Sequence, residues 1–176
     1  GNNIRSFYYS LIQRTWNSFF FFSLVLLATQ ATFSQTALEA PLPERFNGLK
    51  EILLVNHFPN PVYATTDEDS KFQYLWKHTT SVLSVETAVQ IESCGAYIFY
   101  NNQWNLRIDY QPKDCAKLFD CPKAKIKKGQ PYTFKDDWRT DNALRGGWAM
   151  WYFIGKTDAG EQVYGVGKID TVGEVK

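Results

Sequence analysis

The chain has 176 residues, of which 44% are hydrophobic and 16% are aromatic, and its 19 basic residues nearly balance its 18 acidic residues. A chain of this length is typical of one domain. The balanced charge excludes a strongly basic nucleic-acid binder, and the apolar content excludes a mostly disordered chain. Three cysteines are too few for a disulfide-dense mini-protein.

Residues 1–34 have the composition of a secretory signal peptide. They contain two arginines and no acidic residue, and the segment 19–28 is an apolar run. The small residues Thr32 and Ser34 follow it and indicate a cleavage site after Ser34. A membrane span needs about 20 apolar residues, and this run has half of that. We therefore predict a cleaved signal peptide over residues 1–34, with an uncleaved N-terminal anchor as the alternative.

Residues 35–50 are expected to form an irregular leader, because Pro41 and Pro43 disfavour regular structure. Strand patterns dominate the rest of the chain. Residues 96–100 and 104–110 predict a β-hairpin with two asparagines at its tip. In the second arm, apolar and polar residues alternate, which places the apolar set on the core. That set is Trp104, Leu106, Ile108 and Tyr110.

The segment 148–154 is apolar on both faces, so we predict a central strand that is covered on both sides. Its partner is the segment 163–169, where Gly165 and Gly167 share one face and are expected to admit large aromatic side chains opposite. About seven short strands with near-regular turns predict an all-β fold over residues 51–176, a single antiparallel β-sandwich of immunoglobulin-like architecture. A small β-barrel is the alternative.

The three cysteines, Cys94, Cys115 and Cys121, allow one disulfide in an oxidising compartment. We predict the pair Cys115–Cys121, because both residues lie in one expected loop; the pairs Cys94–Cys115 and Cys94–Cys121 remain alternatives. Cys94 would then be a small buried hydrophobic residue. A sharper alternative makes Cys94 a nucleophile with His57 or His78 as its base, but the spacing indicates no such contact.

Neither a metal nor a cofactor is predicted. A metal site would have to combine His57 and His78, which are far apart in the sequence, with a cysteine or a carboxylate. Structural zinc sites contain pairs of ligands only a few residues apart, and this chain has no such pair. A blue copper site would use Met150 as its axial ligand, but this methionine lies in a strand that is expected to be buried.

The most polar segment, residues 136–142, supplies the candidate ligand-binding residues. The acidic side chains suit calcium, but the segment lacks the spacing of a calcium-binding loop. We favour a solvated loop in which Arg139 and Arg145 pair with the carboxylates and Trp138 packs at the edge of the core. Trp138 is also the one ring expected to anchor a ligand at the surface. The candidate residues are Trp138, Arg139, Asp136, Asp137 and Asp141.

Six lysines between residues 113 and 128 favour an edge strand protected from pairing with another sheet, with an anionic surface or polymer as the alternative partner. Taken together, the sequence predicts an exported, non-enzymatic binding module for an envelope protein or a glycan, located in the periplasm, on the cell surface or outside the cell. No nucleic-acid partner and no membrane span after signal cleavage are expected. The alternative is a small envelope enzyme or metal-binding protein that uses Cys94, the two histidines or the loop 136–141. A purely structural assembly subunit is a third possibility.

Overall fold

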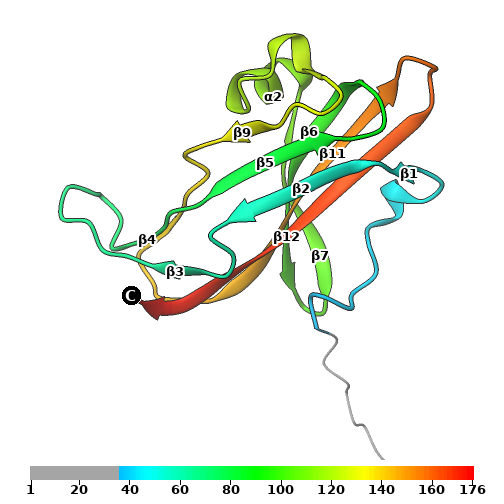
Figure 1. Ribbon diagram of the computed structural model, residues 1–176. Coiled ribbons are helices and arrows are strands. Elements are labelled where there is room, and N and C mark those ends of the chain that lie inside the picture. Colours follow the sequence, from blue (N-terminus) through cyan, green and yellow to red (C-terminus); the bar gives the residue numbers. More distant parts are fainter. Residues whose placement is uncertain (1–35) are drawn as a thin grey trace, which may run out of the picture. The chain divides into compact units, whose positions relative to one another are not determined.

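The computed structural model describes residues 36–176, so the predicted signal peptide lies outside the described residues. The described chain is mostly strand, which confirms the all-β prediction, and one of its sheets is strongly curled, as in a sandwich or a half-barrel (Figure 1). Among residues 36–176, no helix is long and apolar enough to cross a membrane.

The largest sheet has seven strands. Its strands pair antiparallel, as predicted, except that two short strands, β1 and β3, pair in parallel with β12. Five strands follow one another in the order β1 (Lys50–Glu51), β12 (Gln162–Val175), β11 (Gly147–Thr157), β6 (Val89–Tyr100) and β7 (Gln103–Tyr110), with β3 (Val62–Ala64) beside β12 and β8 (Lys125–Ile126) beside β6.

The remaining strands form two smaller sheets. The first contains β2 (Leu53–Phe58), β5 (Thr79–Ser84) and β9 (Tyr132–Phe134), and the second pairs β4 (Tyr74–Trp76) with β10 (Arg139–Asp141). Of three short helical segments, η1 (Glu44–Phe46) precedes β1, and α2 (Pro112–Leu118) and η2 (Pro122–Ala124) lie between β7 and β8. In Figure 1, β2 and β5 lie across β11 and β12, and α2 closes one end of the space between the sheets.

Strand β11 is the central strand predicted from its two apolar faces, because it pairs with both β12 and β6. Its alternate side chains enter two hydrophobic cores. Trp151 and Phe153 pack between the two sheets with residues of β2, β5 and α2. Met150, Tyr152 and Ile154 pack on the opposite face of the sheet, where residues 36–50 cover them.

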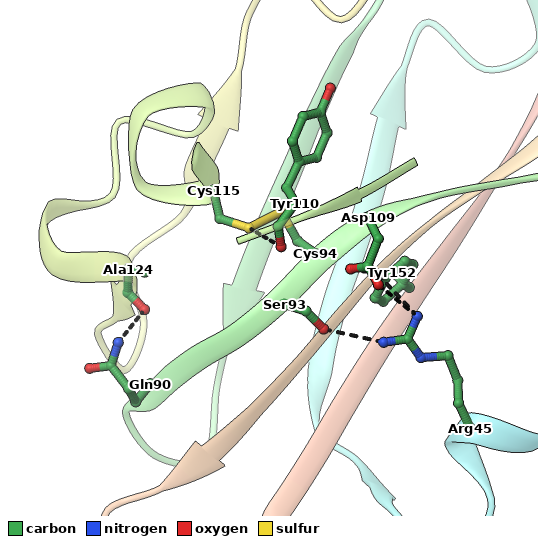
Figure 2. Close-up of a disulfide and its surroundings, with 9 residues drawn as sticks. All are labelled: Arg45, Gln90, Ser93, Cys94, Asp109, Tyr110, Cys115, Ala124 and Tyr152. Carbon is green, nitrogen blue, oxygen red and sulfur yellow. Dashed lines mark hydrogen bonds and ion pairs between the residues drawn. A yellow bond between two sulfur atoms is a disulfide. The ribbon is translucent and has the colours of Figure 1, made fainter. Parts of the chain in front are cut away.

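Residues 36–50 are irregular apart from η1, yet they are docked on the sheet. Phe46 is 4% exposed, and its ring makes edge contacts with Tyr97 and Tyr152. The Arg45 guanidinium lies 3.5 Å from the Asp109 carboxylate and donates to the Tyr152 hydroxyl at 3.2 Å (Figure 2). The leader is therefore a part of the folded domain, and it seals the second core.

Two glycines of β12 allow β2 to cross it closely. A Cβ atom at Gly165 would lie 2.2 Å from the backbone oxygen of Leu53, and one at Gly167 would lie 2.5 Å from that of Val55. The register places the two glycines opposite Phe153 and Trp151, as expected, but the space directly above them is filled by the backbone of β2 and not by an aromatic side chain.

The alternation predicted for residues 104–110 holds only in part. Trp104 is buried, but Leu106 is 50% exposed and Ile108 is 38% exposed. A bulge interrupts the pairing of β6 and β7, because Ala96 pairs with Ile108 whereas the next residue pairs with Leu106. One extra residue in a strand reverses the faces beyond it, and β7 is also the edge of the sheet, where only one neighbouring strand gives cover.

The disulfide joins Cys94 on β6 to Cys115 on α2, so the predicted bridge between Cys115 and Cys121 is wrong (Figure 2). The physical reason is that residues 112–118 form a helix that packs on the sheet and places Cys115 over β6. Cys121 is a free, buried thiol, and its burial raises its pKa to about 11. Cys94 is not available as a nucleophile, because its sulfur is held in the disulfide.

Candidate functional site

A pocket with a volume of about 710 Å³ lies between the tip of the β6–β7 hairpin and the segment 137–149. Its wall includes both ends of β10 and the start of β11, so it is built from parts of the chain that are far apart in sequence. Pockets that hold small ligands have volumes of about 300–1,000 Å³. The size and the mixture of rings and charges on the wall make this pocket the candidate site.

Arg139 is a cation of the pocket wall that is held by three contacts. Its guanidinium carbon lies 4.3 Å from the centre of the Trp76 ring, and its Nη1 donates to the Thr171 hydroxyl at 2.5 Å. Its Nη2 lies 3.7 Å from the Asp141 carboxylate. Burial lowers the pKa of Arg139, although the neighbouring Asp141 carboxylate raises it. This side chain therefore shapes the pocket and partly neutralises Asp141.

Arg107 and Arg145 also line the pocket, and both are exposed. Within residues 36–176, neither guanidinium has an ion pair closer than 4.0 Å or a side-chain hydrogen bond. Three guanidinium groups thus face two carboxylates, those of Asp137 and Asp141, in this pocket. The excess of positive charge, carried by groups with unused donors, favours an anionic ligand.

Aromatic rings form the apolar part of the wall. Trp138 is 43% exposed, and the Lys77 ammonium lies 4.7 Å from the centre of its ring. Trp148 and Trp151 line the same pocket, together with Phe99 and Tyr100 from the β6–β7 hairpin. The predicted packing of Trp138 at the core edge is therefore loose, and much of its ring is open to a ligand.

A second group of polar side chains adjoins the pocket wall through His78 and Asp137. The His78 Nε2 lies 3.4 Å from an Asp137 carboxylate oxygen, and the two side chains are only 5% and 14% exposed. The hydroxyl of Thr80 contacts the same carboxylate oxygen at 2.5 Å. On the other side of that hydroxyl, at 2.8 Å, lies the Nδ1 of the buried His57.

Backbone carbonyl groups orient both histidine rings. The Nε2 of His57 donates to the carbonyl of Gly167 at 2.9 Å, and the Nδ1 of His78 donates to the carbonyl of Trp76 at 3.1 Å. The pKa of His57 is lowered, mainly by burial and also by His78, although the bond to Gly167 and the charge of Asp137 raise it. Neutral His57 therefore turns an unprotonated Nδ1 toward Thr80.

The structure gathers four of the five predicted ligand-binding residues around the pocket, namely Trp138, Arg139, Asp137 and Asp141. Asp136 is exposed and does not line it. Arg139 pairs with Asp141, as predicted for this loop, whereas Arg145 makes no ion pair within 4.0 Å in the described part of the chain.

The sequence did not indicate that His57 and His78 meet. Strand β2 pairs with β5 so that His57 lies opposite Thr80, two residues beyond His78. This pairing joins residues separated by β3 and β4, so no local spacing marks it. The alternation of buried and exposed residues in β2, which places His57 inside, is the one local pattern that bears on it.

No known protein family matches the chain, and no curated protein matches it. Among solved structures, the chain is similar to the X-ray structure of the structural genomics target SoR45, with a TM-score of 0.44 and 13% sequence identity. The similarity covers 70% of this chain and 89% of that chain. A similarity at this level carries no argument about function.

Proposed function

We propose that the protein is an exported binding protein that holds an acidic glycan in the pocket between the β6–β7 hairpin and the segment 137–149. The observation that carries the proposal is the pair of exposed guanidinium groups of Arg107 and Arg145, which make no ion pair within 4.0 Å among residues 36–176, beside the exposed ring of Trp138. Guanidinium groups bind carboxylates through two parallel hydrogen bonds, which makes them suited to a uronic acid or a similar acidic sugar.

The aromatic wall supports a glycan over other anions. The apolar CH face of a sugar ring packs on an indole, and the sugar hydroxyls require polar groups nearby. Here Trp138 and Trp148 supply the rings, and Thr140 and Asp141 supply polar atoms on the same wall. A concave pocket of about 710 Å³ also suits a few sugar units better than the broad, flat surface of a typical protein partner.

Export is supported by two independent features. The composition of residues 1–34 is that of a signal peptide. The disulfide between Cys94 and Cys115 is compatible with an oxidising compartment outside the cytoplasm. A glycan of the cell envelope or its surroundings is therefore a ligand that the protein would meet.

Calorimetric titration of the full chain with trigalacturonic acid tests this function, and the methyl-esterified trisaccharide is the matched neutral ligand. We expect the acid to bind, the ester to bind at least tenfold more weakly, and added salt to weaken binding of the acid, because the guanidinium groups lie in water. Trp138→Ala and Arg107→Gln should each weaken binding about tenfold, the loss expected for about 1.4 kcal/mol.

Lys123→Gln is the control for these variants. It removes one positive charge from an exposed residue that does not line the pocket, so it should change the affinity less than twofold. Equal binding of the acid and its ester would refute the role of the arginines. Binding that Trp138→Ala and Arg107→Gln leave unchanged would place the glycan elsewhere and refute this pocket as the site.

A further inference from the structure

The three side chains of His57, His78 and Asp137, which we call the His–Asp cluster, each offer one ligand atom to a common point. These atoms all lie within 4.8 Å of one another, and two of the three residues are buried. They come from β2, from the link between β4 and β5, and from the turn before β10. Imidazole nitrogen and carboxylate oxygen are the ligands of zinc in sites that keep an open position.

The orientation of both rings is set for a cation at this point. A carbonyl oxygen can only accept, so the contacts to Gly167 and Trp76 fix a hydrogen on the Nε2 of His57 and on the Nδ1 of His78. The other nitrogen of each ring, the Nδ1 of His57 and the Nε2 of His78, faces the cluster. Metal-binding histidines have this same outer arrangement, in which the second ring nitrogen donates to a carbonyl or carboxylate that holds the ring in place.

The contacts inside the cluster form a continuous chain. Three contacts link the Nδ1 of His57, the Thr80 hydroxyl, the Asp137 carboxylate and the Nε2 of His78. The distances along this chain are 2.8, 2.5 and 3.4 Å. The Thr80 hydroxyl therefore holds His57 and Asp137 on either side of it, and the three candidate ligand atoms are gathered before an ion binds.

We propose that the His–Asp cluster binds one divalent transition-metal ion, of which Zn²⁺ is the best match, through the Nδ1 of His57, the Nε2 of His78 and the carboxylate of Asp137. The inference does not depend on the proposed glycan, because it rests on the cluster alone and its test contains no sugar.

The distances indicate how the ligands would close on the ion. Ligand atoms about 2.1 Å from a tetrahedral zinc ion lie about 3.4 Å apart. The distance of 3.4 Å between His78 and Asp137 already fits. All the ligand atoms lie within 4.8 Å of one another, so the widest separation must shorten by at most about 1.4 Å when an ion binds. Asp137 borders the pocket.

The position of the cluster also gives the ion a free coordination site. His78 and Asp137 line the pocket, whereas His57 does not. The fourth position of a tetrahedral ion would therefore be turned toward the pocket, where water or a carboxylate of a bound ligand can occupy it. The metal would add a second anchor for an anionic ligand next to the arginines.

Titration of the chelator-treated full chain with Zn²⁺, followed by competition with a chromogenic chelator, tests the proposal. We expect one ion per chain with a dissociation constant in the micromolar range or below. Asp137→Asn and His78→Gln should each weaken binding at least tenfold. Asp136→Asn, which removes the adjacent exposed carboxylate, should change binding less than twofold. Mg²⁺ and Ca²⁺ should not compete, because they prefer oxygen ligands.

Cobalt substitution supplies a second readout of the same site. Co²⁺ should give visible absorption bands in the parent chain, and these bands should be lost in Asp137→Asn and His78→Gln. Near-ultraviolet circular dichroism shows whether the variants keep the native packing. His57→Gln is also measured if this variant folds, but the test does not depend on it, because His57 does not line the pocket. Absence of a stoichiometric Zn²⁺ site, or binding that Asp137→Asn and His78→Gln leave unchanged, would overturn the proposal.

Discussion

Thr80 links the two halves of the His–Asp cluster through one hydroxyl group. The residue is fully buried, and the hydroxyl contacts both His57 and Asp137. Thr80→Val removes the one hydrogen that this hydroxyl donates to the cluster, so we expect the free energy of unfolding of the metal-free chain to fall by about 1–3 kcal/mol. Thr140→Val, at an exposed position, should cost less than about 0.5 kcal/mol. Urea denaturation of both variants measures this; equal effects would refute the structural role of the hydroxyl.

At the residue scale, the sequence predicted those parts of the site that lie close together along the chain. Trp138, Arg139, Asp137 and Asp141 form one polar segment, and composition alone marks such a segment as exposed and available to a ligand. The histidine contact depends on strand pairing across β3 and β4, a long-range property that no local spacing encodes.

The crossing of β2 over β12 is the element-scale feature that positions the cluster, because His57 lies on β2 and donates to Gly167 on β12. Gly167→Ala would force a Cβ atom to within 2.5 Å of a backbone oxygen. We expect this variant to lose about 1–3 kcal/mol in the free energy of unfolding.

Gly147→Ala is the matched control, because the nearest heavy atom to a Cβ atom there is 3.9 Å away and belongs to a flexible arginine. It should be neutral or slightly stabilising, since alanine reduces the freedom of the unfolded chain. Thermal or urea denaturation compares the two variants. If Gly167→Ala were as stable as Gly147→Ala, that result would contradict the close approach of β2 to β12 at Gly167.

Elements with a strong local pattern were predictable, and those shaped by distant partners were not. β11 was recognised because both of its faces are apolar. The exposure of Leu106 and Ile108 was missed, because a bulge leaves no mark in the alternation of residues. The disulfide was missed because α2 carries Cys115 away from Cys121 and toward β6, and pairing cannot be deduced from spacing.

At the scale of the whole molecule, the disulfide ties α2 to the main sheet across a separation of 21 residues. The chain-entropy model assigns a loop of this length about 3 kcal/mol of stabilisation. We therefore expect the double variant Cys94→Ala/Cys115→Ala to lose about 3 kcal/mol in urea denaturation. Cys121→Ala removes a buried sulfur without a cross-link and should lose clearly less. A double variant as stable as Cys121→Ala would contradict the bridge.

The central claim is that the pocket between the β6–β7 hairpin and the segment 137–149 binds an acidic glycan. The most direct measurement follows the indole N–H signals of the ¹⁵N-labelled chain by nuclear magnetic resonance during titration with trigalacturonic acid. We expect the signals of Trp138 and Trp148 to shift and saturate together, while the signal of Trp104, which is 8% exposed and does not line the pocket, shifts less. Signals that do not move, or a shift confined to Trp104, would contradict this claim.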